Sequence, residues 1–366
     1  MPTIETHVLM PDAEQFLLLS VLSAFLMLIH LPFAGMTLGA GVFSSFFDFL
    51  GWAENKPSLR RFAQGLLGIA LKRFWVIVAL GIIPPVALML FSMQMLYRSG
   101  AHIMVFYQVN VAAYVVGYLL LLLYQRLQDP AKPGTFIFAG IGLAGTSVIG
   151  LALFLTVGLI TVFLSPELWR YFNHYFQFLL SWNMVARFAV IKLLAFAITG
   201  LSILYLGLGS NGEGKYFGSQ ESALAKYFGG GLAIGSVLLL PHVVMWSIHT
   251  SPVVAKSPLM FGFYAIGFVL LIGVAFCLYR VLAENRLASA RTAYVLFLFL
   301  IALFVVNDEV ARARASKERM NVIIADALAK KLALEEKRGM GGGKPDMALG
   351  QKVFDLKCAT CHAFDH

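Results

Sequence analysis

Charged residues are scarce in this sequence. Lys, Arg, Asp and Glu make up 13% of the 366 residues, against roughly 25% in soluble globular domains. Apolar residues make up 59%, and the mean hydropathy is +0.80. A soluble core cannot absorb this much apolar sequence, whereas a bilayer can. The composition therefore predicts an integral membrane protein. In such a protein the net charge of +9 reflects how basic residues sort between the two membrane sides, not nucleic-acid binding.

Cysteine is also rare, with three residues in the chain. Cys277 lies in an apolar run and is interpreted as a packing residue, while Cys358 and Cys361 lie near the C-terminus. So few cysteines exclude a disulfide scaffold. A basic segment before the first apolar run is missing as well, so we expect no cleavable signal peptide.

Long apolar runs dominate the sequence up to residue 308. A spanning helix needs about 20 such residues, and eight runs qualify: 16–50, 64–97, 103–124, 135–164, 174–208, 227–249, 258–283 and 290–307. Pro84-Pro85 is expected to kink the second of these helices. The predicted fold is all-α, with a polytopic transmembrane helical bundle of about eight spans over residues 1–308.

The basic residues predict how this bundle is oriented. An even number of spans places both chain ends on one side of the membrane. Under this topology twelve Lys and Arg residues of the loops fall on one side, and Arg98, Arg170 and Lys256 fall on the other. Basic loops stay on the cytoplasmic side, so both termini are expected on the outer face.

The composition changes after the last apolar run. Residues 309–344 are expected to comprise a charged helix that leaves the membrane and, after it, the glycine-rich hinge Gly339–Gly343. Residues 345–366 are expected to form a separate small unit.

The C-terminal unit contains the motif Cys358-Ala359-Thr360-Cys361-His362. Two thiols at this spacing add to the two vinyl groups of one haem, and the adjacent histidine ligates the iron. The alternative is a chance match or a zinc knuckle, but a zinc site needs four ligands and the chain has no second cysteine pair. The motif therefore predicts covalently bound haem c on Cys358, Cys361 and His362, with His362 as the iron ligand.

The residues before this motif, Gly350 to Cys358, resemble the opening helix of small class I cytochromes c. Such a domain continues for many residues and supplies a distal ligand, whereas this sequence ends four residues after His362. Either the sequence is a fragment, which we favour, or a partner supplies the sixth ligand. In bacteria haem c is attached on the outer face, which agrees with the orientation expected from charge.

Five further histidines are expected in the outer half of the bilayer: His30, His102, His174, His242 and His249. Ionisable residues in spans are functional candidates. His30, His242 and His249 are predicted to ligate one or more b-type haems, with His174 as a further cofactor contact. His242 and His249 are seven residues apart, so they share a helix face at about 10 Å axial separation. The alternative is that each histidine is interfacial or only hydrogen-bonded.

A buried cation is expected in the fifth span. Arg187 lies inside an apolar run, where a charge is costly without a partner. It is predicted to meet a haem propionate or a quinone head group. The alternative is that it snorkels or pairs with an Asp or Glu residue.

The first span resembles the first helix of subunit I of cytochrome bd-type oxidases. The segment that carries the resemblance is Ile29-His30-Leu31-Pro32-Phe33-Ala34-Gly35-Met36-Thr37-Leu38-Gly39-Ala40-Gly41. In that family the corresponding histidine ligates a high-spin haem b near the outer face, so the resemblance implies this role for His30. The spacing of Gly35 and Gly39 also lets another helix approach closely. The chain departs from the family at Ile191, where a low-spin haem ligand is expected, and at 250–257, which is too short for a quinol-oxidising loop.

Together these features predict a membrane-integral cytochrome subunit of a respiratory-type complex, similar to a cytochrome bd-like oxidoreductase. Electrons would pass between outer-face haem c and haem b in the membrane of a bacterium or archaeon. Expected partners are other subunits, a soluble or membrane cytochrome c, and a quinone or O₂. The alternative is a non-catalytic membrane anchor that tethers the haem c segment within a larger assembly. A transporter is the least favoured class, because the spans hold few acidic residues.

Overall fold

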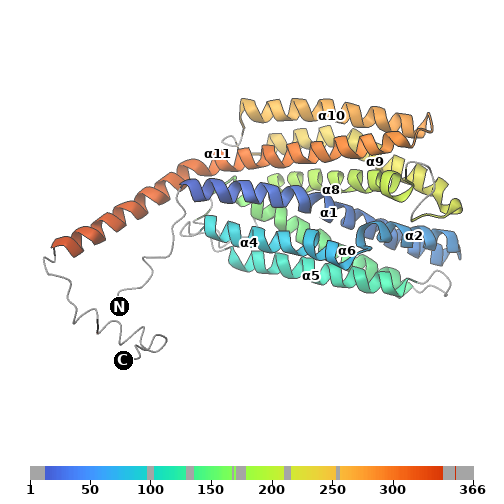
Figure 1. The fold of residues 1–366 in the computed structure, drawn as a ribbon, viewed down its shortest axis with the longest axis horizontal. Helices are drawn as coiled ribbons and strands as arrows, with labels where there is room; N and C mark the ends of the chain where they lie inside the picture. Colours follow the sequence, from blue (N-terminus) through green and yellow to red (C-terminus); the bar gives the residue numbers. More distant parts are fainter. Residues whose placement is uncertain are drawn as a thin grey trace. The chain divides into compact units, whose positions relative to one another are not determined.

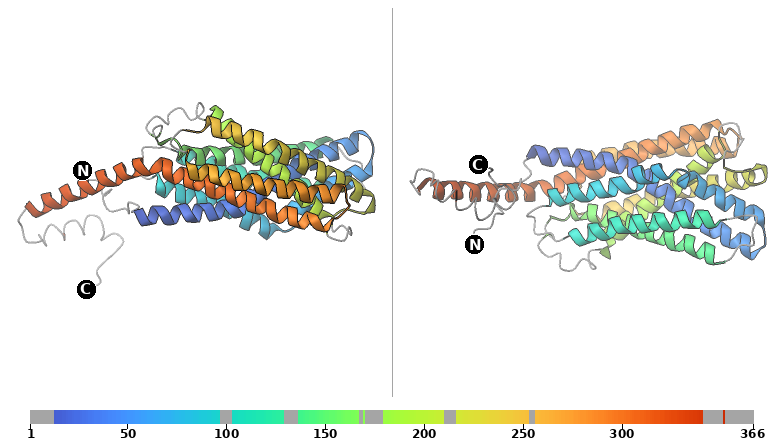
Figure 2. Two further views of the ribbon diagram at one scale, coloured as in Figure 1. Left: turned by 90° about the horizontal axis from the view of Figure 1, so that it is seen from above. Right: turned by 60° about the horizontal axis from the view of Figure 1, so that its bottom comes forward.

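The computed structural model describes residues 13–96, 103–128, 136–166, 169, 179–209, 216–252, 256–340 and 351. By internal contacts the chain divides into one unit of residues 11–319 and a second unit of residues 1–10 and 320–366. Within the larger unit the long helices lie side by side along a common direction (Figures 1 and 2). The described residues contain no β-strand.

The helices account for nearly all described residues. They are α1 (Ala13–Ala53), α2 (Pro57–Leu71), α3 (Phe74–Val76), the π-helix η1 (Ile77–Ile82), α4 (Ile83–Met95), α5 (Met104–Leu127), α6 (Phe136–Val162), α8 (Trp182–Ser202), the π-helix η3 (Ile203–Gly207), α9 (Ser219–Thr250), α10 (Pro258–Leu282) and α11 (Ala288–Met340).

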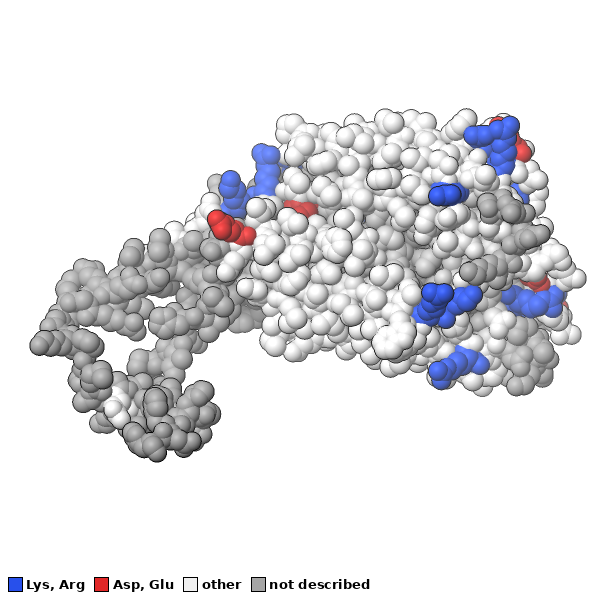
Figure 3. Space-filling model, viewed as in Figure 1, with Lys and Arg blue, Asp and Glu red and all other residues white. Residues whose placement is uncertain are grey.

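Eight helical segments in the described ranges are long and apolar enough to cross a membrane. Figure 3 shows the corresponding surface pattern on one face, with Lys, Arg, Asp and Glu gathered toward the helix ends and an uncharged surface between them. The predicted polytopic helical bundle of eight spans is confirmed, and it requires a lipid bilayer around it.

One predicted span was wrong in its extent. The run 64–97 was expected to be one helix, but α2 ends at Leu71 and α3 begins at Phe74. The break falls at Lys72 and Arg73, because two adjacent cations are costly inside the bilayer. The charged segment that begins at residue 309 is helical and continuous with the last span, since α11 runs unbroken from Ala288 to Met340.

The central helix of the bundle is α1, which packs against α2, α4, α6 and α8. Its contact with α8 depends on small residues. A Cβ placed on Gly35 would lie 3.1 Å from the Cα of Ala195, and one on Gly39 would lie 2.1 Å from Oγ1 of Thr199. The close helix approach expected at Gly35 and Gly39 is therefore confirmed, and its partner is α8.

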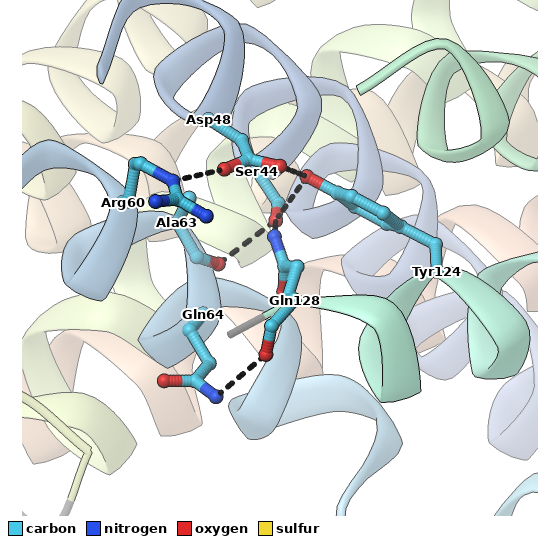
Figure 4. A network of polar contacts seen from close by, with 7 residues as sticks. All are labelled: Ser44, Asp48, Arg60, Ala63, Gln64, Tyr124 and Gln128. Atoms are coloured by element: carbon cyan, nitrogen blue, oxygen red, sulfur yellow. Dashed lines mark hydrogen bonds and ion pairs between the residues drawn. The ribbon is translucent and has the colours of Figure 1, made fainter. Parts of the chain in front are cut away.

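A polar network joins α1, α2 and α5 near the C-terminal end of α1 (Figure 4). The Arg60 guanidinium lies 3.4 Å from the Asp48 carboxylate, and the Tyr124 hydroxyl donates to the same carboxylate at 3.1 Å. Gln128 donates to the Ser44 hydroxyl at 3.1 Å. These side chains are buried. Because buried charges are stable only when paired, the network fixes how the three helices meet.

We predict that Gly39→Val destabilises the bundle, because the added side chain overlaps Thr199. Overpacking of this kind costs about 1–3 kcal/mol. Thermal unfolding of the purified protein in detergent measures the effect. The matched control is Gly235→Val, because a Cβ at Gly235 meets no described atom within 4 Å. Equal unfolding temperatures for the two variants would contradict the close α1–α8 contact.

Candidate functional site

His30 lies at the centre of the bundle, and its ring is held from two sides. The side chain is 1% exposed. Its Nδ1 lies 2.8 Å from the carbonyl oxygen of Leu80 in η1. The ring also meets Tyr114 of α5 edge to face, with 4.9 Å between ring centroids. The predicted ligand is thus buried at a junction of α1, η1 and α5.

The Leu80 carbonyl is available because of the proline pair that follows it. In an α-helix this carbonyl would accept from the amide of residue 84, and in a π-helix from that of residue 85. Both positions are proline, and proline has no amide hydrogen. Just before Pro84-Pro85 the helix changes from the π-helix η1 to the α-helix α4. The consequence of the proline pair is a carbonyl without a helical donor, to which His30 donates.

This hydrogen bond sets the tautomer of His30. A carbonyl oxygen only accepts, so geometry assigns the ring hydrogen to Nδ1. Nε2 then carries a lone pair, and no described residue forms a hydrogen bond with it. Metal-ligating histidines show the same arrangement, in which one nitrogen donates to a backbone carbonyl and the other binds the metal.

Polar groups continue from the His30 ring toward α6. The Tyr114 hydroxyl lies 3.1 Å from Oγ1 of Thr156, and Asn110 donates to the same oxygen at 2.9 Å. Thr156 also lines a cavity of about 30 Å³ between α1, α6, α8 and α11. This volume holds about one or two water molecules. His30 does not line this cavity, although Leu31 beside it does.

The far wall of this cavity is a buried ionic cluster of α8 and α11. Arg187 pairs with Asp308, and Arg312 pairs with Glu309. Nε of Arg312 also lies 3.8 Å from the Asp308 carboxylate. The four charges balance, as buried charges require. The sequence left open whether Arg187 meets a cofactor or an acidic residue, and in the structure it pairs with the acidic residue Asp308.

His242 and His249 share one face of α9 with Met245, as their spacing predicts. All three side chains are exposed on the surface of the chain, and the two histidines point away from the bundle core. Beside them, the rings of Trp182 and Trp246 lie 6.1 Å apart. In the described part of the chain no three His, Cys, Asp or Glu side chains form a metal-binding group. His30 is buried at the junction of α1, η1 and α5, whereas His242 and His249 lie on an exposed face of α9.

The other predicted site residues lie outside the described residues. These are His174 and the haem c motif residues Cys358, Cys361 and His362. Their assignment stays a prediction.

Sequence reasoning missed the partners of the predicted residues. Tyr114 had no distinguishing pattern, and Asp308 stood only at the end of the last apolar run. The pair Pro84-Pro85 is the one sequence signal that the Leu80 carbonyl lacks a helical donor, but from the sequence alone we predict only a kink there. No family model, curated protein or solved structure matches this chain. The resemblance to cytochrome bd subunit I therefore also stays a prediction.

We predict that Asp308→Asn strongly destabilises the bundle, because Arg187 would keep a buried charge without its carboxylate. Breaking a buried pair costs about 3–5 kcal/mol. The control is Glu284→Gln, whose pair with Arg280 is partly exposed and should contribute at most about 1 kcal/mol. Chemical unfolding in detergent compares the two. A loss no larger than the control's would contradict a tightly paired Arg187.

Proposed function

We propose that this chain is the membrane-integral cytochrome subunit of a respiratory-type electron-transfer complex. Electrons would pass between haem c on the Cys358–His362 motif and a b-type haem ligated by His30. The haem c part rests on the sequence motif. The single structural observation that supports the haem b part is the buried Nε2 of His30, which has no hydrogen-bond partner among the described residues.

His30 has the donor chemistry of an axial haem ligand. The Leu80 carbonyl holds the ring through Nδ1, which fixes its orientation and raises the basicity of Nε2. The His30 side chain is 1% exposed, so it is shielded from solvent. His30 is almost fully buried and does not line the cavity beside α1, which itself holds about 30 Å³, far less than the roughly 300–1,000 Å³ of ligand sites. Side chains around His30 must therefore separate to admit a porphyrin. A bound haem would supply an iron that gains and loses one electron.

The path of α11 supports a link between the bundle and the haem c motif. The helix that forms the last span continues to Met340, and Cys358 follows eighteen residues later. We further propose that both termini lie on the outer face of a bacterial or archaeal cytoplasmic membrane. Other subunits, a cytochrome c, and a quinone or O₂ would be its redox partners.

A non-catalytic anchor is the second candidate function, and two observations favour it. His242 and His249 point away from the bundle core, where they could contact a neighbouring subunit. Arg187 already has a carboxylate partner, so a haem propionate is not required to balance its charge. In an anchor, haem c alone would carry electrons and the bundle would hold no haem b.

We expect Cys358→Ala with Cys361→Ala to abolish covalent haem, because each thiol forms one thioether bond to the porphyrin. Haem staining after denaturing electrophoresis detects the covalent group. Cys277→Ala is the control, since Cys277 lies in α10 and packs in the core. Covalent haem that survives in the double variant, or is absent from the unmodified protein, would refute the haem c assignment.

We expect His30→Ala to remove one b-type haem, measured by pyridine haemochrome analysis of the purified subunit. Pro84→Ala should keep Nε2 but supply a helical amide for the Leu80 carbonyl. The His30 ring would then lose its hydrogen bond to Leu80. We expect the haem to stay bound in this variant, with a shifted midpoint potential. The comparison is His242→Ala on the exposed face of α9. An unchanged haem b content in His30→Ala would contradict the assignment of His30 as a ligand. The absence of haem b from the unmodified subunit would favour the anchor function.

A further inference from the structure

A second cavity lies between α8, α9, α10 and α11, away from His30. Its volume is about 420 Å³, within the roughly 300–1,000 Å³ of small-molecule sites. Most lining side chains are aliphatic or aromatic, including Phe263, Phe268 and Phe304. Such a lining favours an apolar ligand body, because apolar side chains form no hydrogen bonds with water and are more stable in contact with another apolar group.

Two polar side chains, Tyr264 and Asn307, face this apolar cavity. Asn307 is 3% exposed, and its Oδ1 has no hydrogen-bond partner among the described residues. A buried amide oxygen left unpaired destabilises a protein, and the bilayer supplies no water to solvate it. A ligand with a hydrogen-bond donor would satisfy this oxygen. The cavity thus combines an apolar chamber with a polar end formed by Asn307 and Tyr264.

The cavity opens sideways, toward the bilayer. Met245 of α9 and Phe268 of α10 both line it. The same side chains are 65% and 54% exposed on the surface of the bundle. Both belong to membrane-spanning segments, so a ligand can enter between α9 and α10 directly from the lipid. This route selects a molecule that dissolves in the membrane.

We propose that this cavity binds a membrane-soluble alcohol or phenol, with the apolar body in the chamber and the hydroxyl donating to Oδ1 of Asn307. A hydroxyl group also accepts, so it can pair with the neighbouring Tyr264 hydroxyl. The site consists of residues on α8 to α11 and requires neither haem c nor haem b. It therefore stands independently of the electron-transfer proposal.

Equilibrium binding of radiolabelled hexadecanol and nonylphenol tests the site, using the full chain in phospholipid nanodiscs. Each probe is compared with its methyl ether, which keeps the body but cannot donate a hydrogen bond. We expect each ether to bind about five- to tenfold more weakly, the usual effect of one lost hydrogen bond. Tighter hexadecanol binding would identify an aliphatic alcohol as the ligand type, and tighter nonylphenol binding a phenol.

Variants of α11 locate the site. Asn307→Leu should weaken binding of the hydroxyl probes to the level of their ethers. Leu303→Trp should fill the cavity, and Phe299→Trp is its matched control, since Phe299 is exposed on the same helix and does not line the cavity. Equal affinity for alcohol and ether in the unmodified protein would overturn the proposal. So would equal binding loss in Leu303→Trp and Phe299→Trp.

Discussion

The hydrogen bond from His30 to the Leu80 carbonyl is the interaction on which the central part of this bundle depends. Pro84 and Pro85 remove both helical donors for that carbonyl, and the bilayer offers no water in their place. Nδ1 of His30 supplies the missing donor and lies 2.8 Å from the Leu80 carbonyl oxygen. The bond ties α1 to the π-helical entrance of α4. It also leaves Nε2 as the free nitrogen, so one backbone irregularity sets both a helix contact and the chemistry of a side chain.

The same constraint explains the other polar contacts of the bundle. Several of them cross-link helices: Arg187 of α8 pairs with Asp308 of α11, and Asp48 of α1 meets both Arg60 of α2 and Tyr124 of α5. Polar groups in lipid must find partners within the protein. Among the buried side-chain atoms that have no hydrogen-bond partner in the described residues, two have a further feature. Nε2 of His30 belongs to a ring oriented by a backbone carbonyl, and Oδ1 of Asn307 belongs to a side chain that lines a cavity of about 420 Å³. We infer that such atoms mark places where a ligand completes the structure.

The sequence alone predicted the features that depend on local hydropathy and spacing. The eight spans follow from apolar run length, and the α1–α8 contact from the small residues Gly35 and Gly39. The shared face of His242 and His249 follows from their spacing of seven residues. Helical periodicity cannot say which neighbour a face meets, so the outward direction of these histidines was not predictable.

Features that depend on tertiary packing required the structure. The acid that pairs with Arg187 lies 121 residues away, and nothing local to either residue indicates the other. The cavity at Asn307 is formed by four helices, and one sequence does not reveal a space between them. The break at Lys72 and Arg73 was missed because the apolar run on either side outweighed two cations. The haem c motif is the opposite case, since its chemistry is contained in five consecutive residues.

Solid-state ¹⁵N NMR of the histidine rings in lipid bilayers tests the central claim most directly, with the His30 signals assigned by their loss in His30→Ala. The account predicts a protonated Nδ1, and an Nε2 that is either unprotonated or shifted by bound iron. A His30 ring with the hydrogen on Nε2 and an unprotonated Nδ1 would contradict it, because the Leu80 carbonyl could then not orient the ring and Nε2 could not bind a metal.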